Sequence, residues 1–275
     1  MNTVIVNNNH LLSVAVEAAH AAGKKARELF GRPHEVSKKS RRDVVTEADF
    51  AAQQIITEMI LDAFPDHGFL PEEEDASLPD TGPVIWVIDP IDGTVNYSRG
   101  IPLFCVSIAA LRETPSPGVE DVLAAVIYDP MLDETFTATA NGPALLEGAG
   151  MHGRALHVTN TDRISDAIIG VDWALEDEPR RQGTAFNARV AGEALVLRGL
   201  GTAALAMAWV AAGRLDAYIN HQLKPWDVAA AALLVKQAGG VTGDISGRPL
   251  SFDRDGLSCL LTNSQLQELL AAVAV

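Results

Sequence analysis

The chain has 275 residues, 48% hydrophobic and 21% charged, which is a composition typical of a globular protein of one large or two small domains. Its 36 Asp and Glu residues against 21 Lys and Arg residues give a net charge of −15, which argues against a nucleic acid polymer as partner. No stretch approaches the roughly 18 uncharged apolar residues of a membrane span, so we expect no membrane partner. The N-terminus lacks the basic start and apolar core of a signal peptide, and both cysteines lie in apolar runs, so we expect a cytoplasmic protein with free, buried thiols.

The first half of the chain alternates helical and β-like segments. Thr46 and Asp49 have the spacing of a capping box at a helix start. Pro90 lacks a backbone N–H and is expected to stop the strand that runs into Asp89. The predicted elements are helices over 10–30 and 46–64, a buried strand over 86–88, and antiparallel strands over 104–112, 122–128 and 134–139.

The second half has the same mixture in blocks. The predicted elements are strands over 168–173, 216–220 and 257–261 and near 241, and helices over 186–197, 202–212, 227–238 and from 265. Strands and helices in blocks indicate an α+β protein with two closely packed halves. Glycine and alanine cluster around 140–160, so we predict halves of 1–150 and 151–275.

The segment 86–97, WVIDPIDGTVNY, is the most informative part of the chain. A buried strand that ends in Asp89 and Asp92, followed by Gly93 and Thr94, gathers negative charge at one place. Two carboxylates this close repel each other unless a cation lies between them. Mg²⁺ prefers such oxygen ligands and often completes its shell with substrate phosphate, and it would also give this acidic protein a local positive charge for an anionic substrate.

Other acidic residues occupy positions that local structure makes special. Asp49 lies in the first turn of a helix, where it is either a cap alone or part of a site. Asp227 lies at another helix start, where it either favours the helix dipole or binds a ligand. The acidic run 72–75 precedes the central strand and is either a solvated loop or a source of metal ligands.

Five motifs in order make the chain similar to the inositol monophosphatase family over about residues 10–270. The segment 86–97 resembles the family's central signature, and WDVAAA at 226–231 with Gly239-Gly240 resembles its second signature. The other three matches are VTEAD at 45–49, GTAA at 201–204 and DAY at 216–218.

The resemblance implies a layered α/β/α/β/α fold of the inositol monophosphatase and fructose-1,6-bisphosphatase type, usually dimeric. It implies Mg²⁺-dependent hydrolysis of a small phosphomonoester, most simply inositol monophosphate, by metal-activated water with two or three ions per site. The metal ligands it implies are Glu72, Asp89, the carbonyl of Ile91, Asp92 and Asp227. It also implies that Asp49 pairs with Thr94 and that this pair, with Glu72, orients and activates the attacking water.

For the substrate, the resemblance implies that the amides of Gly93 and Thr94 bind phosphate oxygens. It also implies that Lys38 lies at the mouth of the site and helps to bind a further metal ion or the phosphate region.

Three positions depart from the family pattern. Pro71 replaces a glycine before Glu72, which leaves Glu73 or Glu74 as alternative ligands. Asn220 replaces a glutamate that contacts sugar hydroxyls, so the substrate preference is expected to differ. Lys224 adds a positive charge near the pocket and is either a surface lysine or a contact for a second anionic group on the substrate.

Other functions use the same residues. A fructose-1,6-bisphosphatase, a histidinol-phosphatase or a 3′-phosphoadenosine-phosphate phosphatase would share the chemistry and differ only in the pocket over about 160–225. A non-catalytic metal- or phosphate-sensing module would keep the fold but is expected to have lost a ligand or Thr94, and all of these residues are present.

Overall fold

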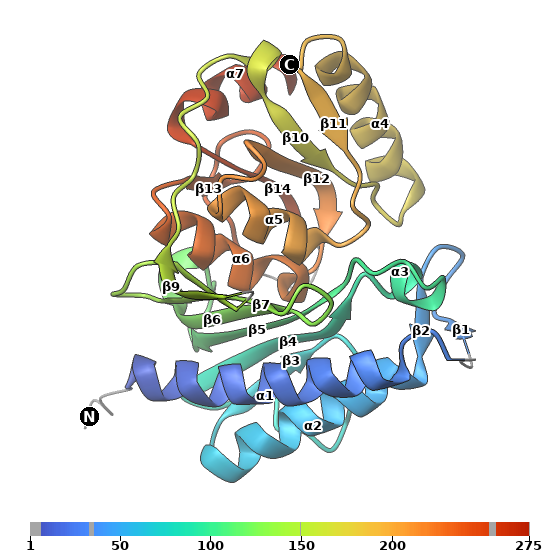
Figure 1. Ribbon diagram of the computed structural model, residues 1–275, viewed down its shortest axis with the longest axis vertical. Helices are drawn as coiled ribbons and strands as arrows, with labels where there is room; N and C mark the ends of the chain where they lie inside the picture. The colour runs from blue at the N-terminus through green and yellow to red at the C-terminus, as the bar shows by residue number, and fades with distance from the viewer. Residues whose placement is uncertain (1–6, 33–35, 149, 253–256, 275) are drawn as a thin grey trace.

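The helices and strands of this protein stack in alternating layers, as the computed structural model shows for residues 7–32, 36–148, 150–252 and 257–274 (Figure 1). Two helices cover the outer face of the larger sheet, two lie between the two sheets, and two cover the outer face of the smaller sheet. This is the α/β/α/β/α arrangement of an α+β fold, as predicted.

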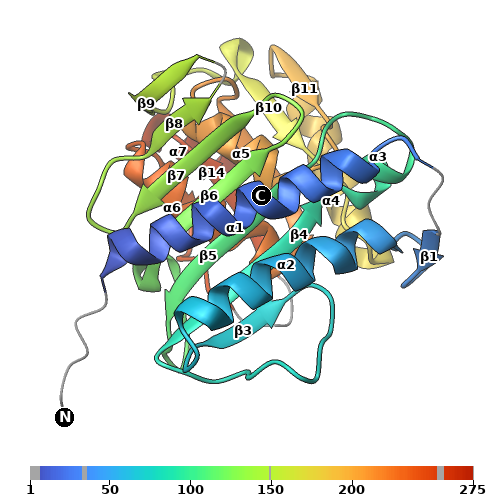
Figure 2. The same cartoon turned by 60° about the horizontal axis from the view of Figure 1, so that its bottom comes forward.

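The first layer consists of α1 (Asn8–Leu29) and α2 (Glu47–Ala63), which lie side by side across the larger sheet (Figure 2). Alanines dominate the buried face of α1, so the two helices and the sheet approach closely. The predicted capping box at Thr46 and Asp49 is present at the start of α2.

The larger sheet has seven strands in sequence order, antiparallel from β4 onward as predicted and with β3 parallel to β4. Its strands are β3 (Gly68–Pro71), β4 (Val84–Asp92), β5 (Cys105–Arg112), β6 (Val122–Asp129), β7 (Glu134–Thr139), β8 (Leu145–Gly148) and β9 (Met151–Ala155). Because helices cover both faces, β4 and β6 are buried almost throughout and lack an alternating polar pattern.

The central helices, α5 (Ala203–Ala211) and α6 (Pro225–Gln237), pack between the two sheets. Their side chains are apolar nearly all round, since each helix contacts a layer on either side. One apolar core therefore joins residues from both sequence halves, such as Phe136 of β7 and Leu233 of α6.

The smaller sheet has the order β11 (Val196–Arg198), β10 (Ile168–Val171), β12 (Ala217–Leu223), β14 (Leu257–Thr262) and β13 (Val241–Gly243). Its outer face is covered by α4 (Asp177–Ala191) and α7 (Ser264–Ala274) around a separate apolar core. Three short elements, β1 (Val36–Lys38), β2 (Val44–Thr46) and α3 (Thr94–Ser98), lie together at one end of the molecule (Figure 1).

One predicted helix is wrong in part. The segment 186–197 was expected to be helical, but α4 ends at Ala191 and Val196–Arg198 forms β11, which pairs in parallel with β10. The helix instead begins at Asp177, in a polar segment where only a few residues such as Phe186 and Val190 are buried. Tertiary pairing with β10 outweighs the helical pattern of the chain after Ala191.

The division into halves of 1–150 and 151–275 stays a prediction. β9 of the larger sheet begins at Met151, and the shared core spans both halves. Among the described helices, none combines the length and the apolar character that crossing a bilayer requires.

Candidate active site

A cavity of about 440 Å³ lies where the end of β4 meets the starts of α3, α5 and α6 and the end of β12. Five residues of the sequence-derived metal set line it: Glu72, Asp89, Ile91, Asp92 and Asp227. Gly93, Thr94, Asn220 and Lys224 line it as well. Segments more than 150 residues apart in the sequence therefore contribute to one surface.

The two aspartates of β4 are brought into the cavity by a bulge, and the prediction that the strand stops at Pro90 is wrong. β4 continues to Asp92, but Asp89 pairs with Ser107 and Asp92 with Cys105, so β4 carries one extra residue in between. The bulge accommodates Pro90, which has no N–H to donate to the neighbouring strand. It also turns the Asp89 carboxylate back, where its Oδ1 accepts from Ile91 N at 3.0 Å.

Asp227 completes a cluster of three carboxylates. It lies in the first turn of α6, where its Oδ2 accepts from Lys224 N at 2.8 Å. One carboxylate oxygen from each of Asp89, Asp92 and Asp227 lies within 4.8 Å of the others. Oxygens this close can share a divalent cation.

Glu72 reaches the same place despite the proline before it. Pro71 ends β3, an edge strand where a missing N–H costs nothing, and Glu72 N donates to Ile88 O at 2.9 Å. This bond places Glu72 beside Asp89. Glu73 does not line the cavity, because Gln53 holds its backbone on both sides at 2.7 and 3.0 Å. The geometry favours Glu72 over the alternatives Glu73 and Glu74.

The start of α5 holds the carboxylate of Asp92. Thr202 Oγ1 donates to Asp92 Oδ2 at 2.5 Å, and the amides of Ala203 and Ala204 donate at 3.2 and 2.7 Å. The first N–H groups of a helix have no hydrogen-bond acceptor within the helix, so they suit an anion. The motif at 201–204 does not by itself predict this contact of Thr202.

Thr94 lines the cavity, and Asp49 lies buried behind it. Thr94 Oγ1 lies 3.1 Å from Asp49 Oδ1 and 3.0 Å from the carbonyl of Ile91, either of which can accept its proton. Asp49 is fully buried, and burial raises its pKa while hydrogen bonds from Thr46 and Thr94 oppose that effect. Gly93 has φ +100, and a Cβ there would lie 3.0 Å from Leu103 O, so this turn requires glycine.

The lysine that contacts the acidic loop is Lys39 and not its neighbour. Lys39 Nζ lies 2.9 Å from Glu72 Oε1 and 2.5 Å from Glu73 Oε1. Burial would lower the pKa of Lys39, but these two carboxylates outweigh burial and raise it. Lys38 ends β1 with an exposed side chain and does not line the cavity. Nothing in the residue pattern distinguished the two lysines.

Asn220 belongs to a polar wall on the other side of the cavity. Its Nδ2 donates to Tyr218 Oη at 3.3 Å, and its Oδ1 accepts from Gln222 N at 3.0 Å. Tyr218 in turn donates to Asp172, whose other oxygen accepts from Gly201 N at 3.0 Å. Burial raises the pKa of Asp172 to about 7. Asp172 was not predicted as a site residue, because no motif surrounds it in the sequence.

The charge balance of the cavity fits a divalent cation. Burial raises the pKa of Asp89, and the carboxylates of Glu72, Asp92 and Asp227 raise it further. Burial likewise raises the pKa of Glu72 to about 7, although Lys39 opposes it. These carboxylates are buried and repel one another, and they offer only oxygen atoms as ligands. Such a set of ligands suits Mg²⁺.

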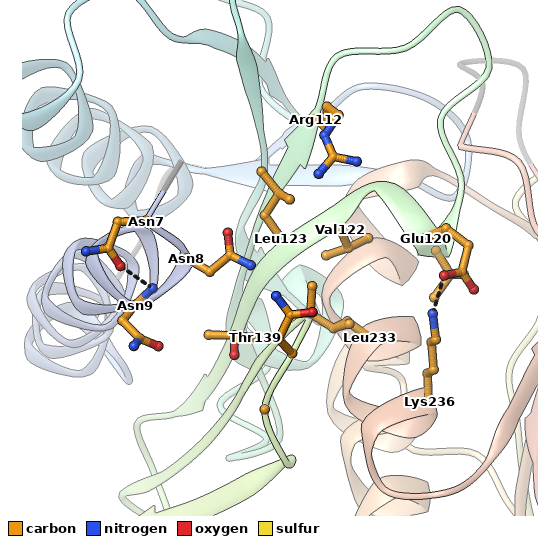
Figure 3. A pocket seen from close by; sticks show the side chains of 14 residues that line it. Asn7, Asn8, Asn9, Arg112, Glu120, Val122, Leu123, Thr139, Leu233 and Lys236 are labelled. Atoms are coloured by element: carbon orange, nitrogen blue, oxygen red, sulfur yellow. Dashed lines mark hydrogen bonds and ion pairs between the residues drawn. The ribbon is translucent and has the colours of Figure 1, made fainter. Parts of the chain in front are cut away.

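A second, larger cleft of about 940 Å³ lies elsewhere, beside the start of α1 and the end of α6 (Figure 3). Its lining is mixed: Arg112, the asparagines at 7–9, and Lys236, which forms an ion pair with Glu120 at 2.6 Å. Among its described residues no group of carboxylates converges, so it lacks the chemistry of the first cavity.

Comparison with known proteins shows the family of this chain. The chain matches the model of the inositol monophosphatase family over residues 7–275. It is 35% identical to an inositol-1-monophosphatase of Rhizobium meliloti, over 90% of this chain and 91% of the relative, and 38% identical to one of Mesorhizobium japonicum, over 86% of each. The crystal structure of the extragenic suppressor protein suhB from Bartonella henselae superposes with a TM-score of 0.86 at 31% identity, covering 96% of this chain and 98% of that one.

Proposed function

From the premise that this chain belongs to the inositol monophosphatase family and is a phosphoric monoester hydrolase, we propose that it uses Mg²⁺ in this cavity to hydrolyse a small phosphomonoester. Inositol monophosphate is the leading candidate substrate. The observation that carries the proposal is the cluster of Asp89, Asp92 and Asp227 beside the hydrogen-bonded pair Asp49 and Thr94. Metal ligands and a group able to orient water then share one cavity.

We assign two or three Mg²⁺ ions to Glu72, Asp89, Asp92, Asp227 and the carbonyl of Ile91. When bound there, Mg²⁺ would neutralise phosphate oxygens and lower the pKa of water. Asp92 has less freedom than its neighbours, because α5 already orients its carboxylate with three hydrogen bonds. It therefore presents a fixed ligand, which supports an ordered site.

The attacking water is oriented by Thr94. The Thr94 hydroxyl donates its single proton in a hydrogen bond to Asp49 Oδ1 or to the Ile91 carbonyl. The lone pairs of the Thr94 oxygen are then left to accept a hydrogen bond from the water. Glu72 lies beside Asp89 and, once ionised, is able to take up a proton from that water. Phosphate oxygens bind to the amides of Gly93 and Thr94, where the chain turns into α3.

The remaining substrate contacts are Asn220 and a lysine. Asn220 offers an uncharged amide to the alcohol part of the substrate. Lys38 stays a prediction for the phosphate region, and Lys39 is the lysine beside Glu72. We also propose that the protein is a homodimer, on the basis of the family resemblance, and light scattering tests this. A cytoplasmic location is proposed from the sequence, and cell fractionation tests it.

The direct test is Asp89→Asn, with phosphate release measured with and without Mg²⁺ on a panel of phosphomonoesters and bisphosphates. The matched control is Asp80→Asn, an exposed carboxylate outside the cavity. We expect Mg²⁺-dependent turnover by the unmodified protein and the control, and loss of turnover in Asp89→Asn with retained folding. Unchanged turnover in Asp89→Asn would refute the assignment.

A further inference from the structure

A further carboxylate lies on the cavity wall, outside the cluster of three carboxylates. Asp172 follows β10 directly, lines the cavity and is partly exposed. Its Oδ1 accepts from Gly201 N at 3.0 Å, and its Oδ2 accepts from Tyr218 Oη at 3.1 Å. Each carboxylate oxygen has two lone pairs, so both can accept a second hydrogen bond from a bound molecule.

Both partners of Asp172 are held by the fold itself. Gly201 has φ +71, and a Cβ there would lie 2.9 Å from Asn96 Oδ1, so its amide reaches Asp172 from a position that requires glycine. Tyr218 is fully buried on β12, which fixes the place of its hydroxyl group. The carboxylate of Asp172 is therefore fixed on the wall.

The charge of this carboxylate is uncompensated. Burial and the nearby Asp92 raise the pKa of Asp172, while the hydrogen bonds from Gly201 N and Tyr218 lower it. None of these groups is a cation. A carboxylate that is largely removed from water without a counter-ion costs free energy, and an amide at this position could accept from Gly201 N without that cost.

The cations of the cavity lining are engaged elsewhere or leave Asp172 unaffected. Arg42 and Arg180 donate to the backbone carbonyls of 174–175, at 2.6 and 3.0 Å. Lys224 is not among the groups that shift the pKa of Asp172. Within the described part of the lining, this stretch of wall is therefore negative.

Asn220 complements Asp172 on the same wall. Its Nδ2 donates one N–H to Tyr218 Oη and its Oδ1 accepts from Gln222 N, which leaves one N–H on the amide. Asn220 thus offers a donor, and Asp172 offers acceptors, on either side of the Tyr218 hydroxyl group. A hydroxyl group both donates and accepts, so it matches this pair. A phosphate group has a negative charge and mainly acceptor oxygens, so Asp172 repels it.

We propose that Asp172 is a specificity-determining residue of this cavity, which accepts hydrogen bonds from hydroxyl groups of the substrate and excludes a second phosphate group from the wall. The proposal rests on the phosphatase function proposed above. The wall has no carboxylate at Asn220 of β12, and Asp172 supplies one from the neighbouring strand β10.

The test measures phosphate release from inositol 1-phosphate and inositol 1,4-bisphosphate, which share a ring and differ in one phosphate group. For the unmodified protein we expect kcat/KM at least about 10-fold lower on the bisphosphate. Asp172→Asn keeps the shape and an acceptor for Gly201 N but removes the charge. We expect it to lower kcat/KM on the monophosphate about 10-fold, mainly through KM, and not to lower it on the bisphosphate.

Two further variants complete the test. Asp172→Glu keeps the charge and is expected to retain most of the preference for the monophosphate. Asp162→Asn removes an exposed carboxylate outside the cavity and is expected to change neither substrate. Thermal melts of each variant check that it is folded.

Three outcomes overturn the proposal. An equal fall on both substrates in Asp172→Asn gives Asp172 a structural role, and an unchanged ratio leaves it without a role in selection. Turnover of the bisphosphate by the unmodified protein as fast as the monophosphate contradicts exclusion, and this result needs no variant to fold. Failure of the phosphatase function itself is distinguishable, since the unmodified protein would then release phosphate from no compound of the wider panel.

Discussion

Thr94 Oγ1 lies 3.1 Å from Asp49 Oδ1, although the two residues are 45 positions apart in the chain. Asp49 belongs to the first turn of α2 and is held there by Thr46, while Thr94 begins α3 at the end of β4. The cap of α2 and the pair that we propose to orient the attacking water therefore share one carboxylate, so a change at Asp49 is expected to affect both.

Thr94→Ala removes the hydroxyl group and keeps Asp49 in its cap. We expect kcat to fall about 100-fold or more, which is the usual contribution of a positioned proton-transfer group, with a small change in KM. Thr94→Ser keeps the hydroxyl and is expected to retain most of the activity. Steady-state kinetics of both variants measure the contribution of the hydroxyl group. Equal rates for Thr94→Ala and Thr94→Ser would contradict the proposal that Thr94 orients the attacking water.

Thr202→Val removes the side-chain hydrogen bond to Asp92 with little change in volume. Contacts that orient a metal ligand contribute about 10–100-fold to metal affinity, so we expect Mg²⁺ or Mn²⁺ to bind that much more weakly by calorimetry. Thr202→Ser keeps the donor and is the control. If both variants bind metal as tightly as the unmodified protein, the contact with α5 does not tune the site.

Asp89→Asn is expected to make the metal-free protein more stable. Burial and three neighbouring carboxylates raise the pKa of Asp89, so its ionised form is disfavoured in the folded protein relative to the unfolded chain. A carboxyl whose pKa is raised by folding stabilises the fold at low pH, and that contribution is lost as the pH rises through the folded pKa. Removing the charge avoids this loss, and we expect a gain of about 1 kcal/mol in chemical denaturation at pH 8. Lower stability of the variant at pH 8 would contradict this account.

Mg²⁺ is expected to raise the melting temperature of the unmodified protein more at pH 8 than at pH 6. Burial raises the pKa of Glu72 to about 7, so at pH 6 protons compete with the cation for this carboxylate, and at pH 8 they do not. Thermal melts at both pH values with and without Mg²⁺ measure the difference. In Asp89→Asn the Mg²⁺ effect is expected to be small at either pH, and an effect of full size there would place the cation elsewhere.

Lys39→Met and Lys38→Met distinguish two adjacent lysines. Lys39 contacts Glu72 and Glu73, so its loss leaves two carboxylates without their cation, and we expect activity to fall about 10-fold. The pKa of Glu72 is then expected to rise, which moves the acidic limb of the pH profile to higher pH. Lys38 is exposed outside the cavity, and Lys38→Met is expected to stay within about twofold. The reverse order of effects would assign the phosphate region to Lys38.

Local patterns predicted much of the fold because local interactions create those features. Thr46 and Asp49 read as a capping box since both bonds of a capping box form within four residues. Apolar runs identified most strands of the buried sheets. Two predictions failed where a distant partner decides: β11 forms because β10 offers it a pairing edge, and β4 passes Pro90 because pairing with β5 resumes beyond a bulge.

The sequence by itself determined which chemical groups this protein can bring to a site. They are the carboxylates at 72, 89, 92 and 227, the hydroxyl at 94 and the glycine turn at 93. Only the tertiary structure decided which atoms meet. It brought Thr202 to Asp92 across 110 positions, put Lys39 in contact with Glu72, and placed Trp173 and Asp172 at the cavity. The physical reason is that a residue's type follows from the sequence, whereas its distance to a residue far along the chain depends on how the layers pack, which no local pattern encodes.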